Sequence, residues 1–196
     1  MGRIEVNEYG TKRYYRGTKL HRIGGPAIEW KNGRKAWYVN GVLHRDGGLP
    51  AIQGSRSRKE FWVNGDLHRD GGLPAVEDPN RGNLWYEHGK RHRDGGLPAV
   101  EESDGTRFWY VNDVLHRDNG LPAVEFVDGS RDWWVNGKRH REDGLPAVES
   151  SDGTREWYVD GVLHREDGLP AVDFGDGEME WWINGVQVTE EKAKSN

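Results

Sequence analysis

The sequence predicts an all-β protein, an elongated single-layer antiparallel β-sheet built as a repeat array of about eight units of 24 residues. Three observations predict it. One motif recurs at a nearly fixed period, turn dipeptides separate short runs of β-branched and aromatic residues, and 28 Gly and 8 Pro in 196 residues disfavour helix.

The recurring motif is a variant of Leu-His-Arg-x-x-Gly-Leu-Pro-Ala-Val. Its histidines follow one another at intervals of 24 residues, except that the first precedes the second by 23: His21, His44, His68, His92, His116, His140 and His164. A fixed period of this length is typical of stacked supersecondary units. The same residues are therefore displayed many times along a line, whereas a catalytic pocket needs different residues that converge once.

Asn-Gly and Asp-Gly dipeptides mark the expected hairpin turns. Asn136-Gly137 and Asp128-Gly129 each interrupt a run rich in Val, Trp and Phe, and equivalent dipeptides recur along the chain. Both dipeptides favour two-residue type I′ turns, whose central residues need positive φ. The sequence therefore predicts two hairpin turns in each unit.

Two-residue turns fix the register of the predicted strands. Counting from Asn136-Gly137 places Trp134 opposite Arg139 and Trp133 opposite His140, and counting from Asp128-Gly129 places Val124 opposite Trp133. Side chains directly opposite each other share a face. We thus expect one packed face with Val124, Trp133 and His140, and a partly solvated face with Ala123, Trp134 and Arg139.

The ring position of the packed face repeats with little variation. We expect these side chains to form a structural aromatic column: Trp37, Phe61, Trp85, Trp109, Trp133, Trp157 and Trp181, with Tyr14 ahead of them. Each unit then passes to the next through a Gly reversal, and a proline such as Pro146 opens the following strand. No composition break interrupts the array, so residues 1–196 are expected to form one domain with a polar, frayed C-terminal tail at 189–196.

Composition narrows the class of protein. The 21 aromatic residues (10 Trp, 7 Tyr, 4 Phe) indicate a folded chain, although only 34% of residues are hydrophobic. The net charge of −5, from interspersed acids and bases, argues against nucleic acid as a partner. Without Cys there is no disulfide or thiolate metal site, and no apolar run approaches the roughly 20 residues that span a bilayer. A cytoplasmic location is expected.

The segment Trp134 to His140, followed by Gly144 and by Asp152-Gly153, resembles the MORN repeat. The resemblance covers about Tyr9 to Val188, but the Gly that follows His in that family is Arg here, and Leu-Pro-Ala-Val replaces its small-residue strand. The chain looks like a MORN-like variant similar to repeat proteins of phages, large DNA viruses and some bacteria. The resemblance implies an elongated sheet used for scaffolding or dimerisation, and host cytoplasm if the source is viral.

The sevenfold His-Arg pair is the main candidate binding surface. We predict a binding stripe along this surface, formed by Arg45, Arg69, Arg93, Arg117, Arg141, Arg165, His44, His68, His92, His116, His140 and His164. Each Arg can form an anion-binding fork or an inter-repeat ladder with an acid of the next unit. Each His can bind metal or can cap the ring and bond a turn. Equivalent residues of neighbouring two-stranded units lie ~10 Å apart, too far to share one ion, so no metal site is expected.

Two hypotheses for function remain open. The first is a non-enzymatic scaffold that binds a protein partner, or a second copy, through an extended β-face. The alternative is a protein that sequesters a small anionic ligand, a nucleotide or sugar-phosphate, between Arg and an aromatic ring. No cofactor is expected, and the lack of a nucleophile motif or phosphate loop argues against an enzyme. His88 and Pro79 depart from the repeat frame, either as a contact site or through sequence drift.

Overall fold

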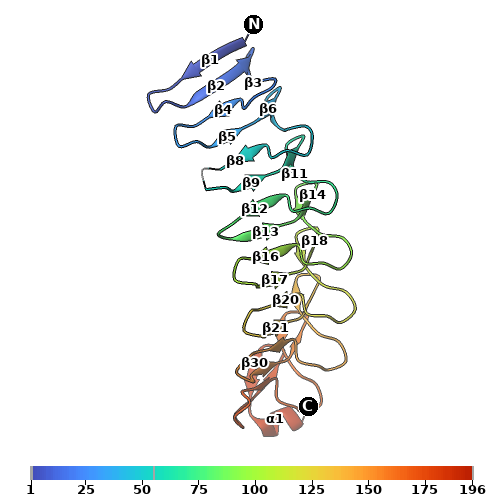
Figure 1. Cartoon of the computed structure of the whole chain (residues 1–196). Helices are drawn as coiled ribbons and strands as arrows, with labels where there is room; N and C mark the ends of the chain where they lie inside the picture. The colour runs from blue at the N-terminus through green and yellow to red at the C-terminus, as the bar shows by residue number, and fades with distance from the viewer. Residues whose placement is uncertain (1, 55, 196) are drawn as a thin grey trace. The chain divides into compact units, whose positions relative to one another are not determined.

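The computed structural model describes residues 2–54 and 56–195 and confirms the predicted fold class. It is an all-β repeat array in which every strand pairing is antiparallel (Figure 1). Contacts group the residues into two compact units, one ending at Asp94 and the other beginning at Gly95. We describe each unit by itself, and the expectation of one domain over 1–196 stays a prediction.

The N-terminal unit contains a sheet and three separate two-stranded hairpins. The sheet strands are β1 (Gly2–Val6), β2 (Lys12–Arg16), β3 (Lys19–Leu20), β4 (Ile28–Glu29), β5 (Lys35–Ala36), β8 (Ile52–Gln53), β9 (Lys59–Glu60), β12 (Val76–Asp78) and β13 (Gly82–Leu84). The hairpins are β6 (Tyr38–Val39) with β7 (Val42–Leu43), β10 (Trp62–Val63) with β11 (Asp66–Leu67), and β14 (Tyr86–Glu87) with β15 (Lys90–Arg91).

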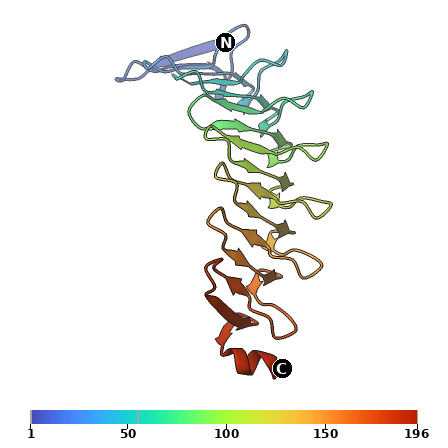
Figure 2. The same cartoon turned by 60° about the horizontal axis from the view of Figure 1, so that its bottom comes forward.

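The C-terminal unit repeats the arrangement. Its sheet strands are β16 (Val100–Glu102), β17 (Arg107–Phe108), β20 (Val124–Glu125), β21 (Arg131–Asp132), β24 (Val148–Glu149), β25 (Arg155–Glu156), β28 (Val172–Asp173), β29 (Met179–Ile183) and β30 (Val186–Val188). Its hairpins are β18 (Tyr110–Val111) with β19 (Val114–Leu115), β22 (Trp134–Val135) with β23 (Lys138–Arg139), and β26 (Tyr158–Val159) with β27 (Val162–Leu163). Figure 2 shows the sheet strands of this unit following one another in sequence order.

The Asn-Gly hairpins have the predicted geometry. Asn136 and Gly137 have φ values of 51° and 79°, as a type I′ turn requires, and Trp134 pairs with Arg139. The main chain of His140 donates to the carbonyl oxygen of Trp133 at 3.1 Å, which continues the same register. The register expected from this turn is confirmed.

The turn at Asp128-Gly129 differs from the prediction, and the register counted from it is wrong by one residue. Val124 pairs with Asp132, not with Trp133. Gly129 alone has positive φ, 91°, and the Asp128 carboxylate instead accepts the N–H of Ser130 at 2.9 Å. This is a three-residue loop, a type I turn closed by a left-handed Gly. The Asp side chain stabilises this loop by accepting a hydrogen bond from the backbone N–H two residues later.

The strand bends at the ring position because the backbone there is hydrogen-bonded both to the main sheet and to a hairpin. Trp133 donates its N–H to the carbonyl of Ala147 in the next repeat, at 2.8 Å, and accepts from His140 in its own hairpin. Successive hairpins are joined in turn, since Gly161 donates to the carbonyl of Arg139 at 2.9 Å. Each ring therefore lies at a corner between the main sheet and a column of hairpins.

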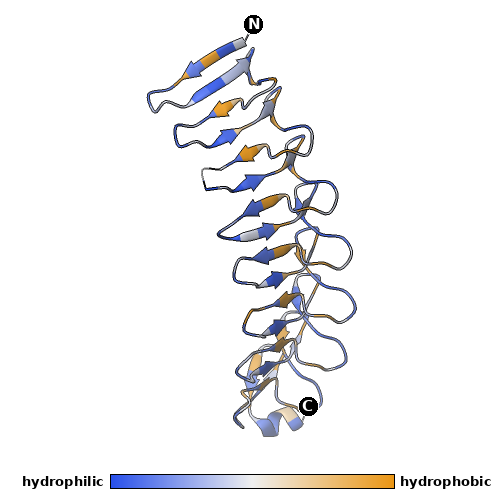
Figure 3. Ribbon diagram, in the orientation of Figure 1, coloured by the Kyte–Doolittle hydropathy of each residue, from blue (hydrophilic) through white to orange (hydrophobic). Residues whose placement is uncertain are grey.

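The core is formed by the Ala and the Val or Ile of each repeat together with the rings. The Ala of every Leu-Pro-Ala segment is fully buried: Ala51, Ala75, Ala99, Ala123, Ala147 and Ala171 all have 0% exposure. The following Val or Ile is also buried, except for the half-buried Val100, and so are most rings of the aromatic column. Figure 3 shows the consequence in the sheet, where apolar first strands alternate with hydrophilic second strands. Trp134 and Arg139 are half-buried, as predicted. Ala123, expected with them on the partly solvated face, is fully buried, because the Asp128-Gly129 register that placed it there is wrong by one residue.

The C-terminal tail contains a short helix where the sequence predicted fraying. Helix α1 (Glu190–Lys194) begins at Thr189, whose side chain accepts the N–H of Lys192. Ala193 is buried, and the helix contacts β29. An N-cap with Glu190 in the first turn favours this helix, but its packing against the last repeat was not visible in the polar composition.

Replacing Trp109 by Ala tests the column. Because this ring is only 5% exposed, we expect a loss of ~3–5 kcal/mol in the free energy of unfolding, measured by denaturant titration. Val127→Ala, at a position 69% exposed, is the matched control and should change it by less than ~0.5 kcal/mol. Equal effects of the two substitutions would contradict the buried column.

Candidate binding surface

Each Arg of the predicted stripe lies flat on the ring of its own repeat. The guanidinium carbon is 3.6–3.8 Å from the ring centroid in seven pairs: Arg22–Tyr14, Arg45–Trp37, Arg69–Phe61, Arg93–Trp85, Arg117–Trp109, Arg141–Trp133 and Arg165–Trp157. A guanidinium over an aromatic face is attracted by the ring quadrupole. The ring face that a nucleotide base would need is thus occupied by the protein's own side chain.

The same guanidinium groups are hydrogen-bonded to the next repeat. Arg117 donates to the carbonyl oxygen of Pro122 at 3.1 Å and to the carboxylate of Glu125 at 2.9 Å. Arg141 does the same with Pro146 and Glu149, at 3.2 and 2.8 Å. These are the inter-repeat ladder contacts, and both bonds of each guanidinium come from Nη1.

The inter-repeat contact of Arg is weaker where the Glu eight residues later is replaced. Eight residues after Arg45 the chain has Gln53, and eight residues after Arg165 it has the shorter Asp173. Burial lowers the pKa of both of these arginines from its ordinary value, with Asp173 opposing the effect at Arg165. Arg remains protonated at neutral pH, so the missing Glu changes the strength of the contact and not the charge.

Most of these His side chains use both ring nitrogens, but the buried Nδ1 of His92 has no hydrogen-bond partner among the described residues. In six repeats Nδ1 accepts the backbone N–H at the first turn position of the next hairpin, as His44 does from Asn64 at 3.1 Å and His140 from Asp160 at 3.2 Å. The other four are made by His21, His68, His116 and His164. Nε2 lies 2.9 Å from the carboxylate of Asp46 in the His44 pair. The acceptor role of Nδ1 places the proton on Nε2.

The first repeat lacks this carboxylate. Ile23 stands where later repeats have Asp or Glu, and the buried Nε2 of His21 has no hydrogen-bond partner among the described residues. His21 lines an open hollow of about 590 Å³ together with Ile4, Tyr14 and Tyr15.

The indole N–H groups of the aromatic column donate hydrogen bonds to backbone carbonyl groups. Trp109 donates from Nε1 to the carbonyl oxygen of Gly96 at 2.8 Å, and Trp133 donates to Gly120 at 2.8 Å. Trp85, Trp157 and Trp181 repeat the bond with the glycine 13 residues earlier. Gly120 has a φ of 67°, and this left-handed backbone forms the loop that carries the accepting carbonyl. These five rings are thereby tied to the loop of the preceding repeat.

The predicted stripe is therefore a set of internal contacts, and its side chains are only partly accessible. The His side chains are 12–19% exposed in their pairs with Asp or Glu, and Arg69, Arg117 and Arg141 are 18–19% exposed. Whether this stripe also binds a ligand stays a prediction. The contacts match the ladder alternative for Arg and the turn bond for His. The side chain over each ring face is Arg and not the expected His.

A different repeated position is exposed. The leucine before each Pro-Ala is about half accessible: Leu49 50% and Leu73 51% in the N-terminal unit, and Leu97 49%, Leu121 45%, Leu145 46% and Leu169 46% in the C-terminal unit. We call these six residues the leucine ladder. Sequence reasoning missed it because an apolar residue before a proline in a β-repeat is expected to pack. The signal was the identity of this residue in all six repeats.

The repeat that contains Pro79 and His88 has a buried charged residue, Asp78. Asp78, just before Pro79, is 9% exposed and extends β12 by one residue relative to β8. It accepts the N–H of Asn80 at 3.0 Å and pairs with Arg58 at 3.1 Å. The bond from Asn80 and then the Arg58 guanidinium hold the pKa of Asp78 below its ordinary value, against the effect of burial. His88 occupies the first turn position, with φ 47°, and stacks on His68 at 4.8 Å.

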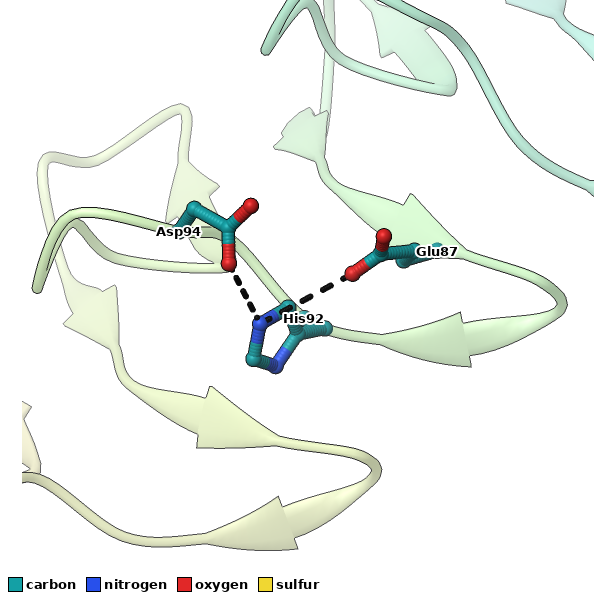
Figure 4. Close-up of side chains that lie close together, drawn as sticks. All are labelled: Glu87, His92 and Asp94. Carbon is teal, nitrogen blue, oxygen red and sulfur yellow. Dashed lines mark hydrogen bonds and ion pairs between the residues drawn. The ribbon is translucent and has the colours of Figure 1, made fainter.

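Three ligand-type side chains lie together beside this repeat (Figure 4). His92 Nε2 is 3.0 Å from Asp94 and 3.8 Å from Glu87. The His92–Asp94 pair is the repeat's ordinary ion pair, and Glu87 adds a carboxylate where other repeats mostly have Val. Asp94 has a 90% exposed side chain, so the cluster lies in solvent. The expectation that the chain has no metal site stays a prediction.

No model of a known protein family matches the chain, and a search of curated protein sequences gives no significant match. The likeness to MORN repeats accordingly stays an interpretation of the sequence. Among the described residues, no helix is both long and apolar enough to span a lipid bilayer.

Arg117→Lys separates stacking from charge. Lys keeps the positive charge but loses the planar group that lies 3.7 Å from the Trp109 centroid and bonds Pro122 and Glu125. We expect the free energy of unfolding to fall by ~1–2 kcal/mol in a denaturant titration. The control is Arg107→Lys, whose side chain is 56% exposed and 3.9 Å from the same Glu125, with an expected change under ~0.5 kcal/mol. If Arg117→Lys leaves the free energy of unfolding unchanged, the structural role is contradicted and the Arg117 guanidinium is again a candidate ligand-binding group.

Proposed function

We propose that the protein is a non-enzymatic repeat scaffold that binds a protein partner along the leucine ladder. The observation that carries the proposal is the contrast between two repeated surfaces. The His, Arg and ring side chains are consumed by inter-repeat contacts, whereas the Leu side chains stay about half exposed in every repeat that has one. Apolar side chains that recur along one line of a surface are typical of protein interaction sites.

The spacing of the ladder suits an extended partner. Within a unit, equivalent residues of adjacent two-stranded repeats are expected about 10 Å apart. The C-terminal unit offers Leu97, Leu121, Leu145 and Leu169, and the N-terminal unit offers Leu49 and Leu73. A partner with apolar side chains at a matching interval gains several shallow contacts at once, and their combined effect exceeds that of any single site.

The hairpin column is a weaker candidate for the same role. Its exposed position carries Val in several repeats, such as Val114 and Val162, but Asp66, Lys90 and Lys138 interrupt it. Charged residues at this spacing break an apolar line and disfavour dry packing. The leucine ladder has no such interruption in the six repeats that carry it.

The proposal that a small anionic ligand is held between Arg and a ring is less well supported. Seven of these pairs are already stacked at 3.6–3.8 Å, which leaves no gap for a base. A MORN-like relationship and a cytoplasmic location are kept as parts of the scaffold proposal. The repeat pattern and the absence of Cys support them.

The test compares three immobilised forms of the protein against an extract of its source cells. The ladder variant carries Leu121→Glu and Leu145→Glu, and the control carries Val127→Glu at a 69% exposed position of an Asp-Gly loop. We expect at least one protein retained by wild type and control to be lost tenfold or more by the ladder variant, as measured by quantitative mass spectrometry. Denaturant titration confirms that all three are folded. Identical retention by all three forms would contradict the proposal.

A further inference from the structure

The first strand of the N-terminal unit has an open side. Strand β1 pairs with β2 from Gly2–Arg16 to Val6–Lys12, and no described strand pairs with its other side. All five of its residues are exposed, with Ile4 at 62% and Val6 at 61%. The opposite situation is found at the end of the C-terminal unit, where α1 packs against β29. Natural sheets usually cover, shorten or charge such an edge.

The backbone groups on this open side are identified by the bonds of β2. Tyr14 directs its N–H to Ala27 and its carbonyl to His21, both away from β1. Tyr14 is opposite Ile4, so these two residues form a non-hydrogen-bonded pair, and the polar backbone groups of Ile4 point outward. Alternation along the strand gives Gly2 and Val6 the same outward direction. The open side thus offers the donors and acceptors of Gly2, Ile4 and Val6.

The sequence of β1 is complementary to itself in one antiparallel register. If Ile4 is placed opposite Ile4 of a second copy, Gly2 comes opposite Val6 and Arg3 comes opposite Glu5. Ile4, Gly2 and Val6 then form hydrogen-bonded pairs, whereas Arg3 and Glu5 form the closer non-hydrogen-bonded pairs, with Cα atoms about 4.5 Å apart. Opposite charges directly across an antiparallel pair are stabilising.

The charges are already positioned for this pairing. Arg3 bonds Glu5 of its own strand at 3.0 Å and lies over Tyr15, with its guanidinium 4.8 Å from the ring. A second strand related by a two-fold axis adds a Glu5 beside each Arg3, which gives an alternating cluster of four charges. It also sets its Ile4 beside the Ile4 that lines the hollow at Tyr14. The edge carries no proline and no bulge that would block such pairing.

We propose that two copies of this protein associate by antiparallel pairing of their β1 strands about a two-fold axis centred on Ile4. This interface is separate from the leucine ladder and goes beyond the scaffold function proposed above. An isologous contact of this kind closes on itself and stops at a dimer. A single strand pair buries less surface than an obligate dimer does, so the association is expected to depend on protein concentration.

A charge exchange tests the register. Arg3→Glu alone places Glu opposite Glu, and Glu5→Arg alone places Arg opposite Arg, so each variant is expected to dimerise at least tenfold more weakly in sedimentation velocity experiments. An equimolar mixture of the two variants again places opposite charges across the interface, and we expect it to restore a heterodimer. An effect on folding within one chain cannot be rescued by mixing, so rescue identifies the intermolecular contact.

Two further variants keep the test decisive. Ile4→Pro removes an outward N–H that β2 does not use, so the monomer should remain folded by circular dichroism while the dimer is lost. The ladder variant with Leu121→Glu and Leu145→Glu should dimerise like wild type, which separates this proposal from the scaffold function. A wild-type protein that stays monomeric at millimolar concentration, or a dimer that survives the single charge variants, would overturn the proposal.

Discussion

The clamp around each aromatic ring is the interaction on which the rest of the structure depends. A ring such as Trp109 has Arg117 of its own repeat on its face, and its N–H is bonded to Gly96 of the preceding repeat. The same Arg117 then reaches Pro122 and Glu125 of the following repeat. One ring and one guanidinium therefore connect three consecutive segments of chain. Thin repeat arrays have no thick core, so such neighbour contacts supply most of their stability.

This constraint explains why the residues with the most evident chemistry do not form an open site. Arg can bind an anion only with donors that are not otherwise engaged, and His can bind a metal only through a free ring nitrogen. In most repeats Nη1 of the Arg is bonded to carbonyl and carboxylate groups, and the His nitrogens are bonded to carboxylate and backbone N–H groups. The apolar leucine ladder stays accessible, and so does the polar edge of β1. Both features are suited to protein partners.

The sequence predicted the parts of the fold that depend on local backbone chemistry. Asn136-Gly137 adopts the expected type I′ turn because both residues tolerate positive φ. Asp128-Gly129 did not follow the same rule. The Asp side chain prefers to bond the N–H of Ser130, which selects a longer loop and shifts Val124 by one residue. A dipeptide alone does not distinguish these outcomes, since Asp160-Gly161 has positive φ at both residues, as a type I′ turn requires.

The candidate site was less predictable because it depends on exposure. The repeated His and Arg were found from their spacing, but their partners lie up to 20 residues away, in the next repeat. The leucine ladder and the open side of β1 are recognised only when it is known which atoms the fold covers. The unpaired Nε2 of His21 belongs to the same class, since it follows from Ile23 replacing a single carboxylate.

A double-mutant cycle between Arg117 and Trp109 tests the clamp most directly. The cycle combines Arg117→Ala with Trp109→Leu and measures the free energy of unfolding of the wild type, both single variants and the double variant. Because the guanidinium lies 3.7 Å from the ring centroid, we predict a coupling energy of about 1 kcal/mol or more. Additive effects, with no coupling beyond the error of the titration, would contradict the account.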